Sequence, residues 1–336
     1  MRLASRAAWI RLSALSFVLG LLVFWGWFKM IRMPGHSFGG PWTPLSADEA
    51  ALQDKLRRDV EFLAGKIGDR NLIAYTQLNA AADFIEKEFS QSGLTVNRLG
   101  FEVQGKTCLN LEAEMRGRTR AGEIVVVGAH YDTVLGCPGA NDNGSGVAAV
   151  LALARSFSTN PPARTLRFMA FVNEEPPHFQ TATMGSRVYA KHCRVRNDNV
   201  VAMLSLETIG YYTDAASSQK YPFPVGLFYP SSGNFIAFVG DTSSASLVRE
   251  CVALFRGGAK FPSEGAALVS WLPGIGWSDH WAFWQEGYPA LMVTDTAPFR
   301  YPHYHTENDT PDKLSYDRMA RVVAGLQTVI AGLVNP

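Results

Sequence analysis

The sequence predicts an α/β fold in which a mostly parallel, mixed β-sheet is flanked by helices on both faces, preceded by one N-terminal transmembrane helix. Uninterrupted apolar runs, typical of buried strands, alternate with stretches of helical periodicity. Several of these runs end in acidic or imidazole side chains. Ligands of such sheets bind beyond the carboxyl ends of the strands, so we expect a functional site along that edge.

The composition is that of a globular chain. Its 336 residues are 47% hydrophobic and 18% charged, enough for one large domain or two modest ones. The net charge of +1 gives no reason to expect a nucleic-acid partner. The sequence shows no fixed-period repeat and does not predict an oligomeric state. Its cysteines lack the close pairs of structural zinc sites: Cys108, Cys137, Cys193 and Cys251.

Residues 1–32 are expected to form a cytoplasmic tip and a membrane anchor. The stretch Leu12–Phe28 is uncharged, mostly apolar and about as long as a short transmembrane helix. It ends in Trp-Gly-Trp-Phe-Lys-Met, whereas a cleaved signal peptide needs small residues there, so we expect an uncleaved single-pass anchor. A Pro/Gly/Ser-rich linker follows at 33–44. Basic residues are slightly denser on the N-terminal side, which favours an extracytoplasmic body: Arg2, Arg6 and Arg11.

The body is expected to span 45–336 and to begin with two helices. Ser46 and Glu49 form the pattern of a capping box, and apolar residues recur from Leu52 to Leu63. A second helix is predicted at Leu78–Ser90 before Gly93. Two stretches with partial alternation predict antiparallel strands at one edge of the sheet: Leu94–Phe101 and Cys108–Met115.

The apolar run Ile124–Ala129 predicts a strand buried on both faces, and it ends in His130-Tyr131-Asp132. Strand alternation lets Asp132 meet His130 and orient its imidazole. The segment Asn-Asp-Asn-Gly-Ser-Gly then places Asp142 at the start of a helical stretch, Val147–Phe157. A purely structural alternative stays open at this point, in which His130 and Asp132 satisfy a strand end and Asp142 caps a helix.

Two further strands end in glutamates. Thr165–Val172 is followed by Asn173, Glu174 and Glu175, and Val200–Leu206 is followed by Glu207. Two adjacent glutamates at the end of an apolar strand predict a chemical role. The remaining expected strands are Phe235–Val239 and Ala290–Val293, and the remaining expected helices are Ser186–His192, Leu247–Phe255 and Leu314–Val334.

A polar loop at 301–310 adds a second imidazole, so that two histidines and three carboxylates are expected to converge. Nitrogen and oxygen ligands without thiolate suit zinc in a catalytic site. Two zinc ions that share a bridging carboxylate would use all five ligands and leave Glu174 free as general base. The candidates are His130, Asp142, Glu175, Glu207 and one of the two loop histidines, His303 or His305.

The order of these motifs resembles the co-catalytic dizinc aminopeptidase family. The motifs are His-x-Asp, Gly-Ala-Asn-Asp-Asn-Gly-Ser-Gly, Asn-Glu-Glu, an acidic residue after an apolar strand, and Tyr-His-Thr-x-x-Asp-Thr. Relatives of that family include glutamate carboxypeptidase, the glutaminyl cyclases and the non-enzymatic transferrin receptor. The resemblance covers about Leu45 to the C-terminus.

The resemblance implies a role for each candidate residue. His130 and Glu207 ligate the first zinc, Glu175 and His305 the second, and Asp142 bridges both. Glu174 is the general base and Asp132 orients His130. A cis peptide is implied between Asp142 and Asn143. Only His305 fits the His-Thr spacing, so it is preferred over His303, and the resemblance places Asp279 and His280 near the site.

Two features depart from the family pattern. Many relatives have aspartate at the position of Glu207, and the segment Pro176–Met184 is longer than the usual turn before Gly185. We expect a membrane-anchored zinc aminopeptidase that hydrolyses peptides. The alternatives are a glutaminyl cyclase, which needs one zinc and no hydrolytic water, and a metal-free receptor or scaffold on the same fold.

Overall fold

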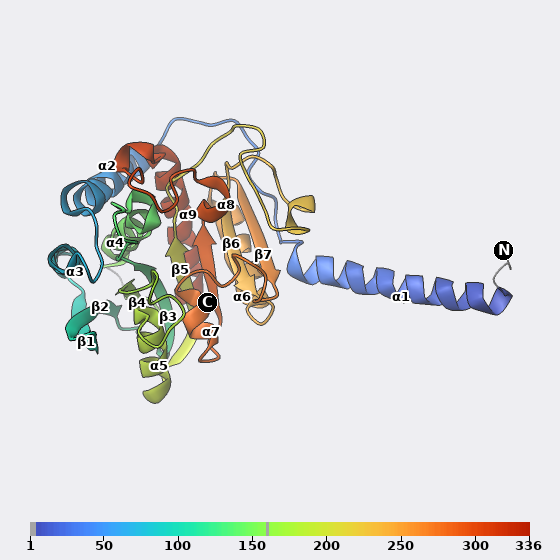
Figure 1. Ribbon diagram of the computed structural model, residues 1–336, viewed down its shortest axis with the longest axis horizontal. Coiled ribbons are helices and arrows are strands. Elements are labelled where there is room, and N and C mark those ends of the chain that lie inside the picture. The colour runs from blue at the N-terminus through green and yellow to red at the C-terminus, as the bar shows by residue number, and fades with distance from the viewer. Residues whose placement is uncertain (1–4, 159–160) are drawn as a thin grey trace.

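The computed structural model describes residues 5–158 and 161–336. Figure 1 shows a rounded body and one long helix, α1 (Arg6–Met30), that projects from it. Arg2, one of the basic residues used for the membrane orientation, lies outside the described residues.

Eight strands of the described chain form one sheet in the order β1-β2-β4-β3-β5-β8-β6-β7. The four central strands β4, β3, β5 and β8 run parallel, and β1 and β2 form an antiparallel edge, which confirms the predicted mixed sheet. The strands are β1 (Thr95–Val103), β2 (Lys106–Met115), β3 (Arg120–His130), β4 (Arg164–Phe171), β5 (Asn199–Glu207), β6 (Ile236–Asp241), β7 (Ser263–Leu268) and β8 (Ala290–Thr294).

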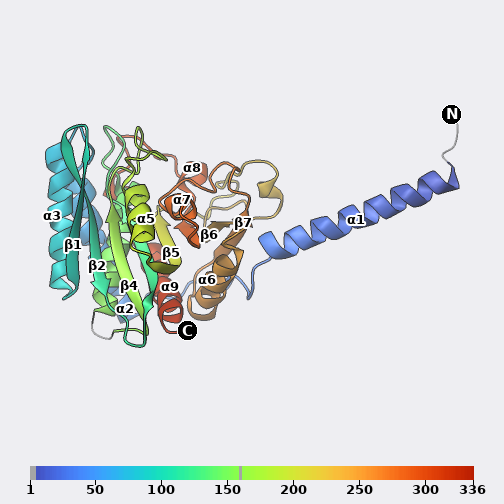
Figure 2. The ribbon, with the colours of Figure 1, turned by 90° about the horizontal axis from the view of Figure 1, so that it is seen from below.

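Helices cover both faces of the sheet, as Figure 2 shows from below. One face packs against α2 (Ala47–Val60), α3 (Tyr75–Gln91), α4 (Gly146–Phe157), α6 (Ala245–Gly258) and α9 (Tyr316–Val334). The other packs against α5 (Gly185–Val195) and the short α7 (His280–Trp284). Shorter helical turns are Glu61–Ile67, Ala140–Ser145, η3 (Val225–Leu227), α8 (Ala297–Arg300) and Pro311–Lys313.

The central strand β3 explains why its apolar run is uninterrupted. Val125 and Val127 belong to the core under α4, whereas Ile124 and Val126 belong to the core under α5 and α7. All four side chains are buried, so neither face of the strand tolerates a polar residue. The same burial holds the carboxyl end of β3 in a fixed position. The candidate site residues His130 and Asp132 lie at this end and just beyond it.

The far edge of the sheet differs from the simplest parallel arrangement. β6 runs antiparallel to β8, and β7, which the sequence analysis did not predict, runs parallel to β6. Asp241 therefore lies at the opposite end of the sheet from the candidate ligands. It accepts hydrogen bonds from Ser243 and from the backbone N of Ser244, at 2.8 Å, and so ends a strand without joining the site.

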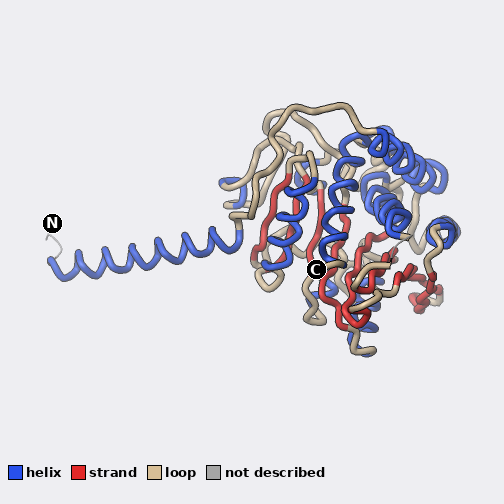
Figure 3. Tube along the Cα trace, turned by 180° about the vertical axis from the view of Figure 1, so that it is seen from behind, coloured by secondary structure: helices blue, strands red, loops and turns tan. Residues whose placement is uncertain are grey.

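The segment after α1 runs along the exposed edge of β7. Arg256 donates to the carbonyl of Pro34 at 3.1 Å, and the backbone N of Ser263 donates to Ser37 Oγ at 2.8 Å. This cover protects an edge strand that would otherwise present unpaired backbone groups. α1 itself has no buried residue, and the view from behind in Figure 3 shows it leaving the body. The four cysteines are buried and free.

Candidate metal centre

Asp132 connects the ends of two neighbouring strands. Its Oδ1 accepts from the backbone N of Glu174 at 3.0 Å and its Oδ2 from the backbone N of Glu175 at 3.1 Å. The Nδ1 atom of His130 lies 3.1 Å from the Asp132 backbone oxygen and 3.6 Å from its Oδ1. These contacts hold the His130 ring on its Nδ1 side and leave Nε2 facing the other candidate ligands.

Asp142 lies in the turn Ala140–Ser145, which enters α4. Asp309 secures this turn, because its two carboxylate oxygens accept from the backbone N of Asn141 at 2.8 Å and of Asp142 at 3.0 Å. The peptide bond between Asp142 and Asn143 is cis, as the resemblance implied. Asn143 then joins the turn to β5, since its Nδ2 donates to the carbonyl of Leu206 at 2.8 Å.

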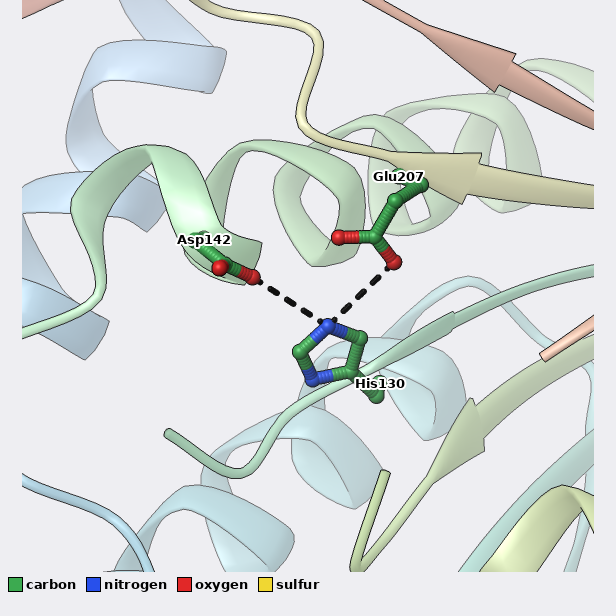
Figure 4. Close-up of side chains that lie close together, drawn as sticks. All are labelled: His130, Asp142 and Glu207. Carbon is green, nitrogen blue, oxygen red and sulfur yellow. Dashed lines mark ion pairs between the residues drawn. The ribbon is translucent and has the colours of Figure 1, made fainter. Parts of the chain in front are cut away.

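His130, Asp142 and Glu207 form the first potential ligand group. Nε2 of His130 lies 3.3 Å from Asp142 Oδ1 and 3.3 Å from Glu207 Oε2, as the dashed lines of Figure 4 mark. One ligand atom from each of the three lies within 4.8 Å of the others. Ser278 donates to Glu207 Oε2 at 2.7 Å, and Ser205 lies 2.7 Å from the Ser278 hydroxyl, so two serines support this carboxylate.

Asp142, Glu175 and His305 form the second group, again within 4.8 Å. His305 Nε2 lies 2.8 Å from Asp142 Oδ2 and 3.4 Å from Glu175 Oε1. Asp142 therefore directs one oxygen toward His130 and the other toward His305, the arrangement of a bridging carboxylate. His303 joins neither group within the described residues, and its backbone oxygen instead accepts from the backbone N of His305.

Glu174 lies between the two groups. Its Oε2 is 3.8 Å from His130 Nε2, and one ligand atom each of His130, Glu174 and Glu175 lies within 4.8 Å of the others. The side chain is buried. The structure thus brings together all seven residues singled out from the sequence: Asp132, the five candidate ligands and Glu174.

Burial and close charges shift the pKa values of the cluster strongly. Burial raises the pKa of Glu174 well above its ordinary value and raises that of Glu175 to about 7. Burial alone would lower the pKa of His130, but the carboxylates of Glu207 and Glu174 raise it well above the ordinary value. Burial also opposes ionisation of Asp142, yet hydrogen bonds to the two histidines hold its pKa below the usual range.

The residues fit metal ions. Among the buried side-chain atoms that make no hydrogen bond in the described residues, three belong to candidate ligands: His130 Nε2, Asp142 Oδ1 and Glu175 Oε1. Buried polar atoms are normally paired, so such atoms indicate an absent partner. Among the described residues, the ion pairs of the four clustered carboxylates involve histidine and no lysine or arginine. Two divalent cations would balance four carboxylate charges.

Sequence reasoning missed the residue that supports the loop before Asp142. The fully buried Arg70 donates to the carbonyls of Tyr131 at 2.7 Å and Gly139 at 3.0 Å. It thereby ties the end of β3 to the turn that carries Asp142. In sequence it lies in Gly-Asp-Arg-Asn, which looks like an exposed loop. Asp309 could have been assigned a role, because it belongs to the Tyr-His-Thr-x-x-Asp-Thr motif.

An apolar cavity adjoins the cluster. Glu207 and Tyr304 line its near end, and its empty volume is about 840 Å³, including space open to solvent. The walls come from one face of β6, β7 and β8 and from the loops above them. Residues that line it include Phe235, Val239, Ala266, Leu268, Ile275 and Met292. A side chain bound beside Glu207 would therefore meet mostly apolar surface.

The long segment Pro176–Met184 folds against the loop before α7. Gln180 donates to the carbonyl of Gly276 at 3.0 Å, and His178 Nδ1 lies 2.8 Å from Thr183 Oγ1. His178 is thus engaged within its own loop. The buried Asp279 is close enough to His130 for their charges to interact, and burial raises its pKa to about 7.

Comparison with known proteins identifies similar chains. The sequence pattern of peptidase family M28 matches residues 110–330. YfbL from Escherichia coli (strain K12) is 34% identical over 309 residues, which cover 89% of this chain and 94% of YfbL. Leucine aminopeptidase 1 from Arthroderma otae is 27% identical over 229 residues, 63% of this chain, and the match spans only 56% of that relative's length.

Solved structures share the fold. The zinc aminopeptidase BSAP from Bacillus subtilis superposes with a TM-score of 0.67 at 16% identity, over 84% of this chain and 95% of that one. A glutaminyl cyclase from Bacteroides thetaiotaomicron gives a TM-score of 0.64 at 15% identity, over 83% and 97%. At this level of identity the likeness concerns the fold and does not separate the two activities.

Proposed function

This chain belongs to peptidase family M28, and from that premise we propose that it is a zinc aminopeptidase with two metal ions per chain. The observation that carries the proposal is the position of Asp142. Its two oxygens face His130 at 3.3 Å and His305 at 2.8 Å, so one carboxylate belongs to two ligand groups. The family membership agrees with the resemblance found in the motifs.

The two ligand groups assign the residues that would hold the metal ions. His130, Asp142 and Glu207 would hold the first, and Asp142, Glu175 and His305 the second. Bound zinc would supply a Lewis acid for the scissile carbonyl and would lower the pKa of a water molecule toward about 7. The absence of thiolate ligands and the unpaired ligand atoms support this assignment.

Glu174 is the proposed general base. Its carboxylate would take a proton from the attacking water and pass it to the leaving amine. The buried position beside both ligand groups supports this role, because burial raises the pKa of the carboxyl and so makes it a better proton acceptor. Asp132 would position His130 and, through its bonds to two backbone N–H groups, Glu174 itself.

The apolar cavity is proposed to receive the side chain of the substrate's N-terminal residue. Its near end is lined by Glu207, a proposed ligand, and by Tyr304, whose ring stacks on His305 with a centroid distance of 3.7 Å. The remaining walls are largely aliphatic and aromatic. Apolar N-terminal residues such as leucine, methionine or phenylalanine are therefore the expected substrates.

We further propose that α1 anchors the enzyme in a membrane and that residues 45–336 form the catalytic domain. α1 is long and apolar enough to cross a bilayer, and none of its residues is buried. The sequence favours a cytoplasmic N-terminus and an extracytoplasmic catalytic domain. A helix this apolar near an N-terminus also fits a signal sequence, so the N-terminal residue of the mature protein distinguishes the two.

Two alternatives make different predictions. A glutaminyl cyclase would use one metal ion and would not hydrolyse peptides, but here both ligand groups are complete. A non-catalytic receptor on this fold would have lost ligands, and none of the five is replaced by a non-ligating residue.

The test is turnover of aminoacyl anilides by the full chain in detergent. Leucine and phenylalanine anilides should be cleaved, and cleavage should stop with a chelator and return with zinc. Cyclisation of N-terminal glutamine without hydrolysis would refute the aminopeptidase and support a cyclase. No turnover of either kind by zinc-loaded protein would support the scaffold.

A further inference from the structure

Four of the large apolar side chains that the body exposes to solvent lie in two loops whose neighbouring residues pack against one core cluster. Phe223, Leu227 and Phe228 lie in the turn that contains η3, with exposed fractions of 88%, 74% and 49%, and Trp271, exposed by 79%, follows β7. We call these four residues the apolar rim. Single exposed apolar residues are common, but a group of four on two such loops indicates a binding surface.

The apolar rim lies next to the end of the proposed anchor. Met30 and Ile31, where α1 ends, pack against the same core cluster as Tyr221, Val225 and Leu272, the neighbours of the rim residues. Figures 1 and 2, which are perpendicular views, both show the short helix η3 beside this end of α1. α1 also contacts β7, the strand that precedes Trp271.

In the described part of the chain, α1 continues directly into residues that contact the body. The apolar stretch Leu12–Phe28 rises by roughly 25 Å, close to the thickness of a hydrocarbon core, so the bilayer surface would fall near Phe28. Met30 already packs on the body. Arg249 of α6 donates to the carbonyl of Phe28 at 3.3 Å and also to that of Arg32, which fixes the exit of the helix.

We propose that the apolar rim inserts into the lipid interface of the bilayer that α1 spans, so that the catalytic body lies docked on the membrane. This inference rests on the proposed anchor. Aromatic side chains favour the interface between hydrocarbon and headgroups, and Lys29, Arg32 and Arg249 would face the headgroups beside them. Tyr221, Val225 and Leu272, which alternate with the rim residues, line the substrate cavity. The cavity therefore opens close to the membrane surface.

The experiment places a polarity-sensitive nitrobenzoxadiazole label on the rim of the full chain. Phe223→Cys supplies the thiol, Leu227→Cys a second position, and the four natural cysteines are buried. The matched control is Ile73→Cys, exposed by 77% in the loop before α3, which packs against β1 and β2 at the opposite edge of the sheet. Each variant is reconstituted into phosphatidylcholine and phosphatidylglycerol vesicles with and without doxyl-labelled acyl chains.

Label at 223 and 227 should show blue-shifted emission and lose intensity with doxyl lipid, whereas label at 73 should show neither change. Emission and quenching that are equal at all three positions would overturn the docking. Flotation separates this failure from that of the anchor. Vesicles that carry the protein without quenching at 223 refute the apolar rim alone, and protein that does not float with vesicles refutes both proposals. Neither result depends on peptidase activity.

Discussion

Ser278→Ala should weaken zinc binding without removing a ligand. The Ser278 hydroxyl donates to Glu207 Oε2 at 2.7 Å and is itself 2.7 Å from the Ser205 hydroxyl. Since the Ser278 proton points to the carboxylate, Ser205 must donate to Ser278. Removing the Ser278 hydroxyl leaves one oxygen of Glu207 without its closest donor in a buried site, and the carboxylate is then free to rotate away from His130.

The magnitude follows from the strength of one hydrogen bond to a charged group. Such a bond contributes about 1.5–3 kcal/mol. If that bond holds Glu207 in its ligating position, zinc affinity falls by roughly 10- to 150-fold, since 1.4 kcal/mol is tenfold. Residues that orient metal ligands typically change affinity by about 10- to 100-fold, which agrees with this range.

The assay is a competition titration of the purified full chain with a chromophoric zinc chelator. Ser205→Ala serves as the graded control, because its hydroxyl is one step farther from the carboxylate, so it should lose less affinity than Ser278→Ala. The double variant should behave like Ser278→Ala, because the Ser205 effect passes through Ser278. Unchanged affinity in Ser278→Ala, or a larger loss in Ser205→Ala, would refute the reasoning.

Three further predictions concern the general base Glu174, the pH dependence of zinc affinity and the contribution of Arg70 to stability. Glu174→Gln should reduce kcat by about 10²- to 10⁴-fold with unchanged zinc content by mass spectrometry, and full activity would exclude it as the base. Zinc affinity should rise from about pH 6 to 8, because burial raises the pKa of Glu175 to about 7 and its proton must leave before it ligates; a flat titration would contradict this. Arg70→Met should lower the free energy of unfolding by about 3 kcal/mol or more, since several buried carbonyls lose their donor, and denaturant unfolding that shows under about 1 kcal/mol would contradict that role.

Much of the fold could be predicted from local patterns. The run Ile124–Ala129 is apolar at every position because β3 is covered on both faces, so the buried part of the strand and its carboxyl end could be predicted, whereas its start at Arg120 could not. Antiparallel pairing of β1 and β2 followed from adjacent alternating stretches joined by a short turn. β7 escaped prediction because Ser-Glu-Gly-Ala-Ala-Leu lacks β-branched residues and is stabilised by its neighbours instead.

The direction of β6 could not be predicted either, because strand direction depends on which neighbour a strand pairs with and not on its own residues. The direction of β6 determines where Asp241 lies. Asp241 ends an apolar strand in the sequence, as the candidate ligands do, but it lies at the opposite end of the sheet from them.

The candidate site was predictable where residues follow strand ends in order, as His130, Glu174, Glu175 and Glu207 do. Support from distant segments was not. Arg70 contacts Gly139, 69 residues away in the sequence, and Ser278 contacts Glu207, 71 residues away. No local pattern predicts either contact. The exposed apolar rim also needed the structure, since only the structure shows that the neighbours of Phe223 and Trp271 pack against the same core cluster as the end of α1.

The most direct test of the dizinc peptidase is metal content by mass spectrometry on the purified full chain, measured beside a chelator-reversible assay with leucine anilide. Two zinc ions per chain together with hydrolysis is the predicted result. One zinc ion per chain in fully active protein would contradict the bridging role of Asp142, and activity that survives complete removal of metal would contradict the zinc peptidase itself.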